Sequence, residues 1–217
     1  MPTLLLRLAA PLQSWGSCSK FETRTTEKMP TKSGVIGILA AALGLKRDAD
    51  LSRFSKLKFG VRADREGEDI TDFHTAKSGK DSYVTYRHYL TDAVFLAGFE
   101  GDAAFLAELE NALKKPKFPL FLGRRSCPPT LPIVVGIREK SLSDALREEP
   151  PLCAVRKSKD SAARVRIETD APNAGMFQDE PISFDPQKRI FGYRKVSEFF
   201  VELPETETEH DAMSELR

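Results

Sequence analysis

A glycine, two arginines and a serine in one short stretch, Gly123-Arg124-Arg125-Ser126, are the residues best suited to chemistry in this sequence. They lie between an apolar run and a Pro-Pro pair, which predicts a turn whose amides and guanidinium groups surround an anion such as phosphate. No Asp or Glu occurs from residue 111 to residue 138, where the six cations are Lys114, Lys115, Lys117, Arg124, Arg125 and Arg138. A basic loop exposed to solvent after a helix is the alternative interpretation.

A second phosphate site is predicted where a helix begins, at Thr31-Lys32-Ser33-Gly34. Thr31 or Ser33 is the expected N-cap. The amides at a helix N-terminus bind anions, Lys32 adds a positive charge, and Gly34 allows a ligand to approach the backbone. A nucleotide-binding P-loop is excluded because no glycine occurs from residue 17 to residue 33, so ATP binding is not expected.

The stretch from residue 10 to residue 30 predicts a long loop, and loops of this length inside a compact domain are usually functional or disordered. Trp15 and Phe21 offer surfaces on which unpaired bases can stack, while Lys20, Arg24 and Lys28 can follow a nucleic-acid backbone. Trp15 has a structural alternative, in which the indole packs the loop onto the core, and this is the favoured role for it. Gln13 and Ser14 precede it in the same loop.

The composition is that of a globular protein, with 217 residues, 41% hydrophobic content and a net charge of +1. The sequence has no apolar run long enough to span a bilayer and no secretory signal, so a cytoplasmic protein without membrane contact is expected. The three cysteines (Cys18, Cys127 and Cys153) are far apart, which suits neither a disulfide framework nor zinc. We expect no metal and no cofactor.

The order of predicted elements is strand (3–9), helix (34–44), strand (57–64), strand (89–99), helix (105–115) and strand (131–138). This is the β-α-β-β-α-β order of a ferredoxin-like or RRM-like domain. The fold predicted is therefore α+β, with a palm over 1–140, an inserted β-hairpin thumb at about 65–88 that turns at Ser78-Gly79-Lys80, and a reduced C-terminal half over 141–217. That half is expected to hold a helix at 141–148, strands at 165–168 and 190–203 with Phe191 in the core, and a disordered acidic tail. The predicted strand at 57–64 has one wet face, which is basic at Lys58 and Arg62.

Motifs spread over most of the chain resemble those of a known family. They are Leu5-Leu6-Arg7-Leu8 with the run from Ala10 to Gly16, Pro30 to Gly34, Asp72-Phe73-His74-Thr75, Arg87-His88-Tyr89-Leu90, and Leu122 to Pro128. In this order and at these intervals they resemble the fifth Cas family, in the CasD form found in type I-E CRISPR Cascade.

The resemblance implies a non-catalytic subunit that caps one end of Cascade and holds the 5′ handle of the crRNA. It implies contacts with the Cascade backbone subunit and large subunit, and indirect contact with target DNA. A thumb reaching over the RNA near the junction of handle and spacer would bring five thumb residues close to nucleotides: His74, Lys77, Lys80, Tyr86 and Arg87.

The two predicted phosphate sites are expected to converge on the same RNA end. The residues predicted to contact RNA are Gln13, Ser14, Trp15, Lys20, Phe21, Arg24, Lys32, Ser33, Gly34, His74, Lys77, Lys80, Tyr86, Arg87, Gly123, Arg124, Arg125 and Ser126. No catalytic residue is predicted.

Two other functions fit parts of the sequence. The first is a metal-independent endoribonuclease, since another branch of the family, from type I-C systems, processes its crRNA. His74 or His88 with Tyr86 or Lys80 could supply its acid and base. The second is a ferredoxin-like domain that binds a small anionic metabolite or acts as a scaffold, which leaves the thumb without a role.

Overall fold

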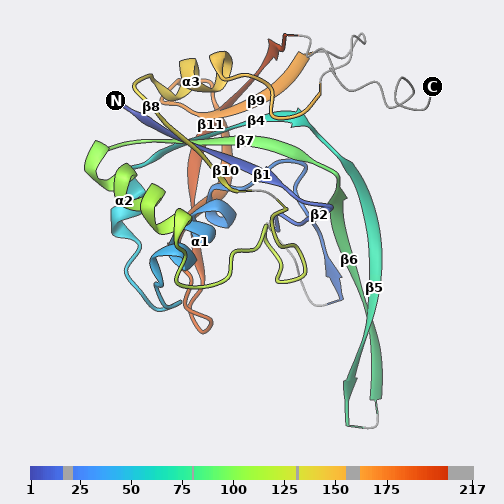
Figure 1. The fold of residues 1–217 in the computed structure, drawn as a ribbon. Helices are drawn as coiled ribbons and strands as arrows, with labels where there is room; N and C mark the ends of the chain where they lie inside the picture. Colours follow the sequence, from blue (N-terminus) through green and yellow to red (C-terminus); the bar gives the residue numbers. More distant parts are fainter. Residues whose placement is uncertain (17–21, 80, 131, 155–161, 205–217) are drawn as a thin grey trace, which may run out of the picture.

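The computed structural model describes residues 1–217 except 17–21, 80, 131, 155–161 and 205–217. Lys20, Phe21 and Lys80, all predicted RNA contacts, lie outside the described residues, as does the acidic tail beyond Pro204. The fold is α+β, as predicted. Its main sheet has seven strands in the order β10-β11-β9-β4-β7-β1-β8, and a smaller sheet is built on a long hairpin (Figure 1).

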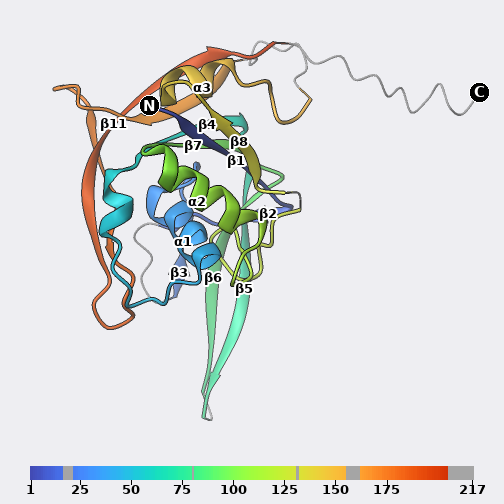
Figure 2. The ribbon, with the colours of Figure 1, turned by 60° about the vertical axis from the view of Figure 1, so that its left-hand side comes forward.

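The middle of the main sheet follows the predicted order of elements. β1 (Thr3–Ala9) pairs antiparallel with both β7 (Val94–Glu100) and β8 (Val134–Arg138), and β7 pairs antiparallel with β4 (Lys58–Arg65). The helices α1 (Lys32–Leu43) and α2 (Ala103–Lys114) cover one face, and α3 (Leu142–Glu148) covers the other (Figures 1 and 2). A short 3-10 helix, η1 (Ser52–Lys56), joins α1 to β4.

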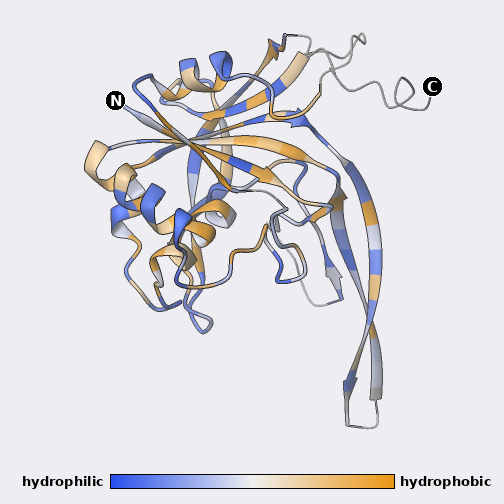
Figure 3. Cartoon of the chain, viewed as in Figure 1, coloured by the Kyte–Doolittle hydropathy of each residue, from blue (hydrophilic) through white to orange (hydrophobic). Residues whose placement is uncertain are grey.

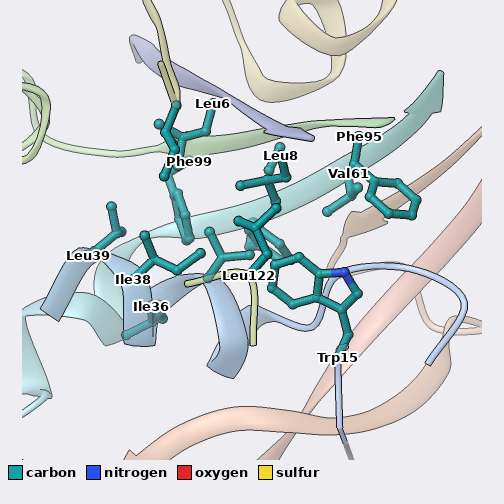
Figure 4. Close-up of a cluster of buried hydrophobic side chains, with 14 of the residues drawn as sticks. Leu6, Leu8, Trp15, Ile36, Ile38, Leu39, Val61, Phe95, Phe99 and Leu122 are labelled. Carbon is teal, nitrogen blue, oxygen red and sulfur yellow. The ribbon is translucent and has the colours of Figure 1, made fainter. Parts of the chain in front are cut away.

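The core follows from the nearly continuous apolar sequence of β1. Leu4, Leu6 and Leu8 are fully buried toward α1 and α2, whereas Leu5 belongs to a smaller cluster under α3. Burial of one such side chain contributes roughly 1.5–3 kcal/mol. Figure 3 shows the hydrophobic residues gathered on the central strands, and Figure 4 shows the cluster between the sheet and α1.

The helix ends agree with the predicted caps. Thr31 is the N-cap of α1, where its hydroxyl accepts a hydrogen bond from the Gly34 amide at 3.2 Å. Gly44 ends the helix in the left-handed region at φ 78°. Ser141 caps α3 in the same way as Thr31 caps α1. These local signals were readable because both partners of each cap lie within a few residues of one another.

The prediction that β4 has a wet basic face is wrong at Arg62, whereas Lys58 at the start of the strand is exposed as predicted. Arg62 has no exposed surface: its guanidinium pairs with Asp64 at 2.6 Å and donates hydrogen bonds to the carbonyl oxygens of Leu146 and Glu149, each at 2.7 Å. Charged and apolar residues do alternate along β4, but the C-terminal end of α3 covers the face on which Arg62 lies. Arg62 therefore holds α3 against the sheet.

The thumb is a hairpin of β5 (Glu68–Ser78) and β6 (Asp81–Thr91) that extends well away from the palm (Figure 1). Its turn includes Gly79 at φ 64°, close to the predicted position. The single strand predicted for 89–99 is wrong. Asp92, at φ 52°, separates β6 of the thumb from β7 of the main sheet, and the polar pair Thr91-Asp92 marks this break in an otherwise apolar stretch. β2 (Leu12–Gln13) and β3 (Thr23–Arg24) pair with the root of β6.

The C-terminal part continues the main sheet beyond β4. β9 (Ala162–Glu168) pairs with β4, β11 (Ile190–Glu202) pairs with β9, and β10 (Gly175–Ser183) forms the edge. β9 and β11 were predicted, and β10 was not. The sequence of β10, GMFQDEPIS, contains a proline and few apolar residues, so it lacks a strand pattern.

A buried ionic network joins this C-terminal part to the start of α1. Lys32 is fully buried, and its ammonium group lies 3.0 Å from a Glu168 carboxylate oxygen and 2.6 Å from one of Glu180. The Lys32 amide donates to Asp179 at 2.7 Å, and Asp179 makes a two-point ion pair with Arg194. Burial raises the pKa of the Glu180 carboxyl, although Lys32 beside it acts in the opposite direction.

This network corrects the role expected for Lys32. The predicted phosphate ligand does not fit a side chain without exposed surface whose charge is neutralised by two carboxylates. The Asp179 carboxylate takes the place beside the first helical amide that an external anion was predicted to occupy. We therefore assign Lys32 a structural role.

Replacing Lys32 by alanine is expected to lower the free energy of unfolding by about 3 kcal/mol, because Glu168 and Glu180 lose their buried partner. Lys58→Ala is the control, since the exposed Lys58 ammonium lies 3.5 Å from Asp170 and such a pair contributes at most about 1 kcal/mol. Urea denaturation of both variants measures the difference. Equal losses would contradict the structural role of Lys32.

Candidate nucleic-acid interface

The two predicted phosphate sites border the same cavity. A cavity of about 710 Å³, here called the basic cavity, lies between α1 with the residues that follow it, the loop at 118–125 and the connection between β10 and β11. Ser33 and Gly34 line it from one side, and Gly123, Arg124 and Arg125 from another. The predicted convergence of the two stretches is therefore observed, although Lys32 is not among the lining residues.

The charge of the basic cavity is entirely of one sign. Its described lining includes no Asp or Glu and six cations, which are Arg24, Lys46, Arg47, Arg124, Arg125 and Arg189. Uncompensated cations in a concave site attract polyanions. Two of the six cations between residues 111 and 138 do not belong to this cavity: Arg138 pairs with Glu149, and Lys114 pairs with Glu110.

Aromatic side chains share this lining with the cations. Four phenylalanines contribute to it, and Phe118 is 46% exposed; the four are Phe118, Phe121, Phe184 and Phe191. Aromatic faces between cations are typical of sites for single-stranded nucleic acid, because bases stack on the rings while the cations neutralise phosphates.

Sequence reasoning missed several residues of the basic cavity, which are Lys46, Arg47, Phe118, Phe121, Phe184 and Arg189. Phe191, which was expected in the core, is only half-buried and lines the cavity. Phe184, Arg189 and Phe191 lie in or next to the connection between β10 and β11. The sequence pattern did not indicate β10 as a strand. Phe118 and Phe121 come just before Gly123 and Arg124 in the sequence, so these two were the easiest of the missed residues to predict.

The Gly-Arg loop, which we define as residues 123–126, packs closely on the segment around Ser14. The Ser14 amide donates to the Leu122 carbonyl at 3.1 Å, and a Cβ atom on Gly123 would lie 1.6 Å from the Ser14 carbonyl oxygen. Gly123 also has φ 90°, which other residues rarely adopt. A glycine is therefore required here by close packing within the protein, and the prediction that it serves an anion remains untested.

Arg124 is held in position by the Tyr89 ring and the Arg24 carbonyl. Its guanidinium carbon lies 4.5 Å from the centre of the Tyr89 ring, and its Nη2 atom donates to the Arg24 carbonyl at 2.8 Å. The Tyr89 hydroxyl is 3.5 Å from that of Ser126. Burial opposes ionisation of Tyr89, but the Ser126 hydroxyl and the Arg124 guanidinium outweigh it and lower the pKa of the tyrosine. Arg125 next to it is exposed.

Trp15 has the structural role that was favoured for it. The indole is 1% exposed, lies in the same cluster as Leu8 and Leu122 (Figure 4), and donates to the Gln13 side chain at 3.2 Å. The Gln13 amide group in turn donates to the carbonyls of Leu8 and Ala93. A Cβ atom on Gly34 would lie 2.9 Å from the Trp15 ring. Gly34 thus makes room for the indole, and Gln13 positions it.

The thumb residues predicted to contact RNA do not lie on one surface. Cross-strand pairing places Phe73 beside Tyr86, both exposed, with Lys77 further along the same face. Arg87 and His74 lie on the opposite face. The structure therefore divides the predicted thumb contacts between two faces. The thumb joins the basic cavity at its root, where β3 pairs Arg24 with Arg87.

Each thumb histidine lies beside a carboxylate. The Nε2 atom of His74 is 2.8 Å from Asp72, and the Nδ1 atom of His88 is 3.1 Å from Asp69. In the described part of the chain, no three His, Cys, Asp or Glu side chains form a group that could hold a metal ion. Among the helices described, none is long and apolar enough to cross a membrane.

Comparison with known proteins identifies relatives over most of the chain. The chain is 36% identical to the CRISPR system Cascade subunit CasD of Escherichia coli (strain K12), in an alignment that covers 64% of this chain and 72% of that protein. A solved structure described as a CRISPR RNA-guided surveillance complex matches 93% of this chain and 91% of its own, with a TM-score of 0.82 and 35% identity.

A second structure, described as the crystal structure of a Cas protein, matches 94% of this chain and 98% of its own, with a TM-score of 0.76 and 38% identity. The model of the CRISPR-associated protein family (Cas_Cas5) matches residues 3–197. The resemblance seen in the sequence motifs is thus confirmed, and the chain belongs to this family of CRISPR-associated proteins.

Proposed function

We propose that this protein is the RNA-binding subunit of a CRISPR Cascade surveillance complex that holds the 5′ handle of the crRNA in antiviral defence. The observation that carries the proposal is the basic cavity, with six cations, no carboxylate and four phenylalanines in its described lining. Its relatives are described as a Cascade subunit and as part of an RNA-guided surveillance complex. A single-stranded RNA end is the ligand that this lining suits best.

In this proposal the phosphates of the handle lie along the arginines of the Gly-Arg loop and Arg24, and unpaired bases stack on the phenylalanine rings. Arg124 needs little reorganisation on binding, because Tyr89 and the Arg24 carbonyl already fix its guanidinium. The thumb, with Phe73 and Tyr86 exposed, reaches over the RNA near the junction of handle and spacer.

We further propose that the first half of the chain is a ferredoxin-like palm. The antiparallel order β8-β1-β7-β4 with α1 and α2 on one face supports this assignment. Residues 141–217 then form an extension whose strands lengthen the palm sheet. As a cap of Cascade in the cytoplasm, the protein contacts the backbone and large subunits, and it meets target DNA through them.

The protein acts by binding and not by catalysis in this proposal. The endoribonuclease alternative draws its support from the pairing of each thumb histidine with an aspartate. Against it, His74 lies on the opposite face of the hairpin from Tyr86, and His88, which shares the face of Tyr86, is held by Asp69 and Thr71. The metabolite alternative accounts for a cationic cavity but not for the projecting thumb.

RNA affinity is expected to fall steeply with salt, with a slope of log affinity against log salt near −3.5 if five phosphates are neutralised. Arg124→Gln combined with Arg125→Gln should reduce the magnitude of this slope by about 1.4, which is about 0.7 for each phosphate contact. Arg53→Gln, which removes an exposed guanidinium paired with Glu108, is the control and should leave the slope unchanged. Fluorescence anisotropy with a short single-stranded RNA gives the slopes; salt-independent affinity would contradict the proposal.

The purified protein is expected to leave CRISPR repeat RNA intact, because the proposed site binds RNA without an acid and base placed at one bond. Gel analysis after prolonged incubation without metal checks this. A discrete cut that disappears in His74→Ala or in His88→Ala would establish the endoribonuclease alternative instead.

A further inference from the structure

One face of α1 forms the floor of the basic cavity. Ser33, Gly37 and Ala41 line the cavity and follow one another at intervals of four residues, which places them on the same face of the helix. Their side chains are short, and all three residues are only half-buried. The backbone of α1 is therefore open to the cavity at Gly37.

The packing of the protein itself does not require a glycine at position 37. A Cβ atom on Gly37 would meet no heavy atom of the described chain within 4 Å outside its own helix backbone and its chain neighbours, whereas one on Gly34 would lie 2.9 Å from the Trp15 ring. Gly37 lies inside α1 and lacks the positive φ that makes a glycine necessary at Gly123. Glycine in a helix interior lowers stability relative to alanine. The glycine instead leaves room for a ligand at the helix backbone.

Phenylalanine rings that the core does not use line the cavity beside this floor. Phe121 and Phe191 are half-buried but belong to neither hydrophobic cluster, and Phe118 is 46% exposed. The aromatic pairs and cation–π contacts of the described residues involve other rings. The Phe118 amide donates to the Ala41 carbonyl at 3.2 Å, which fixes this residue about one helical turn from Gly37. The cavity thus offers an aromatic ligand both an open helix face and free ring surfaces.

We propose that the basic cavity contains a pocket for one unpaired nucleobase, with Gly37 at its floor and the rings of Phe118, Phe121 and Phe191 beside it. This inference rests on the proposed function, since it takes the crRNA handle as the ligand and specifies where one of its bases is bound. The base packs on the helix backbone and against the rings, while the surrounding cations contact the phosphates on either side of it. Gly37 is then a specificity-determining residue, because a larger side chain takes up the room that the base needs.

An apolar segment of a partner protein suits this pocket less well than a base does. Such a segment would cover the six cations of the lining without supplying a counter-charge, and burial of an unpaired charge is costly. A nucleotide combines an aromatic ring and an anionic phosphate in one unit. Its chemistry therefore matches both the rings and the cations of the lining.

Substitution of Gly37 tests the pocket without removing any cation. Gly37→Leu fills it and Gly37→Ala fills it in part; both residues are better helix formers than glycine, and a Cβ atom has room at this position. Ala104→Leu is the control, because it adds a leucine at an exposed position of α2 outside the lining of the cavity. Thermal melting followed by circular dichroism checks that each full-length variant is folded, and Gly37→Ala carries the test if the leucine unfolds the chain.

Affinity is measured by fluorescence anisotropy with a single-stranded RNA of the crRNA handle sequence, and with versions in which each nucleotide in turn is abasic. In the unsubstituted protein we expect one abasic position to weaken binding by roughly tenfold, through the loss of one stacked base. Gly37→Leu should weaken binding of the intact RNA by a similar factor, and Gly37→Ala by less, with an unchanged salt slope because every phosphate contact remains. Gly37→Leu should bind the abasic and the intact RNA equally, since the leucine and the base compete for one space. Ala104→Leu should match the unsubstituted protein throughout.

Unchanged affinity in Gly37→Leu would overturn the proposal, as would a loss that simply adds to the loss caused by the abasic nucleotide. A shallower salt slope in Gly37→Leu would also overturn it, because the leucine would then displace phosphates and not a base. These outcomes are distinct from failure of the proposed function, in which the unsubstituted protein itself binds the handle RNA without a steep salt dependence. If only the pocket is wrong, the steep slope remains and Gly37→Leu has no effect on affinity.

Discussion

The ion pairs between the start of α1 and the strands β9 to β11 are the interaction on which the candidate site depends. Lys32 bridges Glu168 and Glu180, while Asp179 links the first amide of the helix to Arg194. These contacts dock the β10-β11 pair on α1, and the connection between the two strands supplies one wall of the basic cavity. Without this docking, the cavity would keep its Gly-Arg loop but lose that wall. The network also neutralises the charge of Lys32 and occupies the first amide of the helix with Asp179. The groups of the cavity that can bind an anion are therefore its arginines and Lys46.

A steric constraint places the other wall. Gly34 admits the Trp15 indole against α1, and Gly123 admits the Ser14 carbonyl against the Gly-Arg loop. Because Ser14 and Trp15 are consecutive, the two contacts bring the loop and the helix to opposite sides of one short segment. The sequence suggested that both glycines face a ligand. In the structure they face the protein itself, and this close packing is what orients the neighbouring Arg124 and Ser33 toward a common cavity.

The sequence was most informative where both partners of an interaction are local. Caps such as Thr31 and Gly44, the apolar periodicity of the helices and the glycine turn of the thumb each depend on a few neighbouring residues. The role of Lys32 depends on residues more than a hundred positions away, and β10 is recognisable as a strand only through its pairing with β11. The wall that contains Arg189 was therefore out of reach, whereas the Gly-Arg loop and its convergence with the start of α1 were not.

Arginine has several different roles in this protein, and they explain how a chain of net charge +1 can carry a strongly cationic cavity. Where the register of the sheet brings a carboxylate alongside, as at Arg62 and Asp64 or at Arg194 and Asp179, the arginine holds elements together. Other pairs, such as Arg164 with Glu66 and Arg166 with Glu198, use further acidic residues on the sheet. These carboxylates are therefore paired with arginines outside the basic cavity. Since screening limits their reach to about 8 Å in physiological salt, they do not cancel the field at the arginines of the cavity, whose described lining holds no carboxylate. The ability of this fold to bind an anion depends on which cations the strand register leaves without a carboxylate partner. The net charge of the chain does not reveal this.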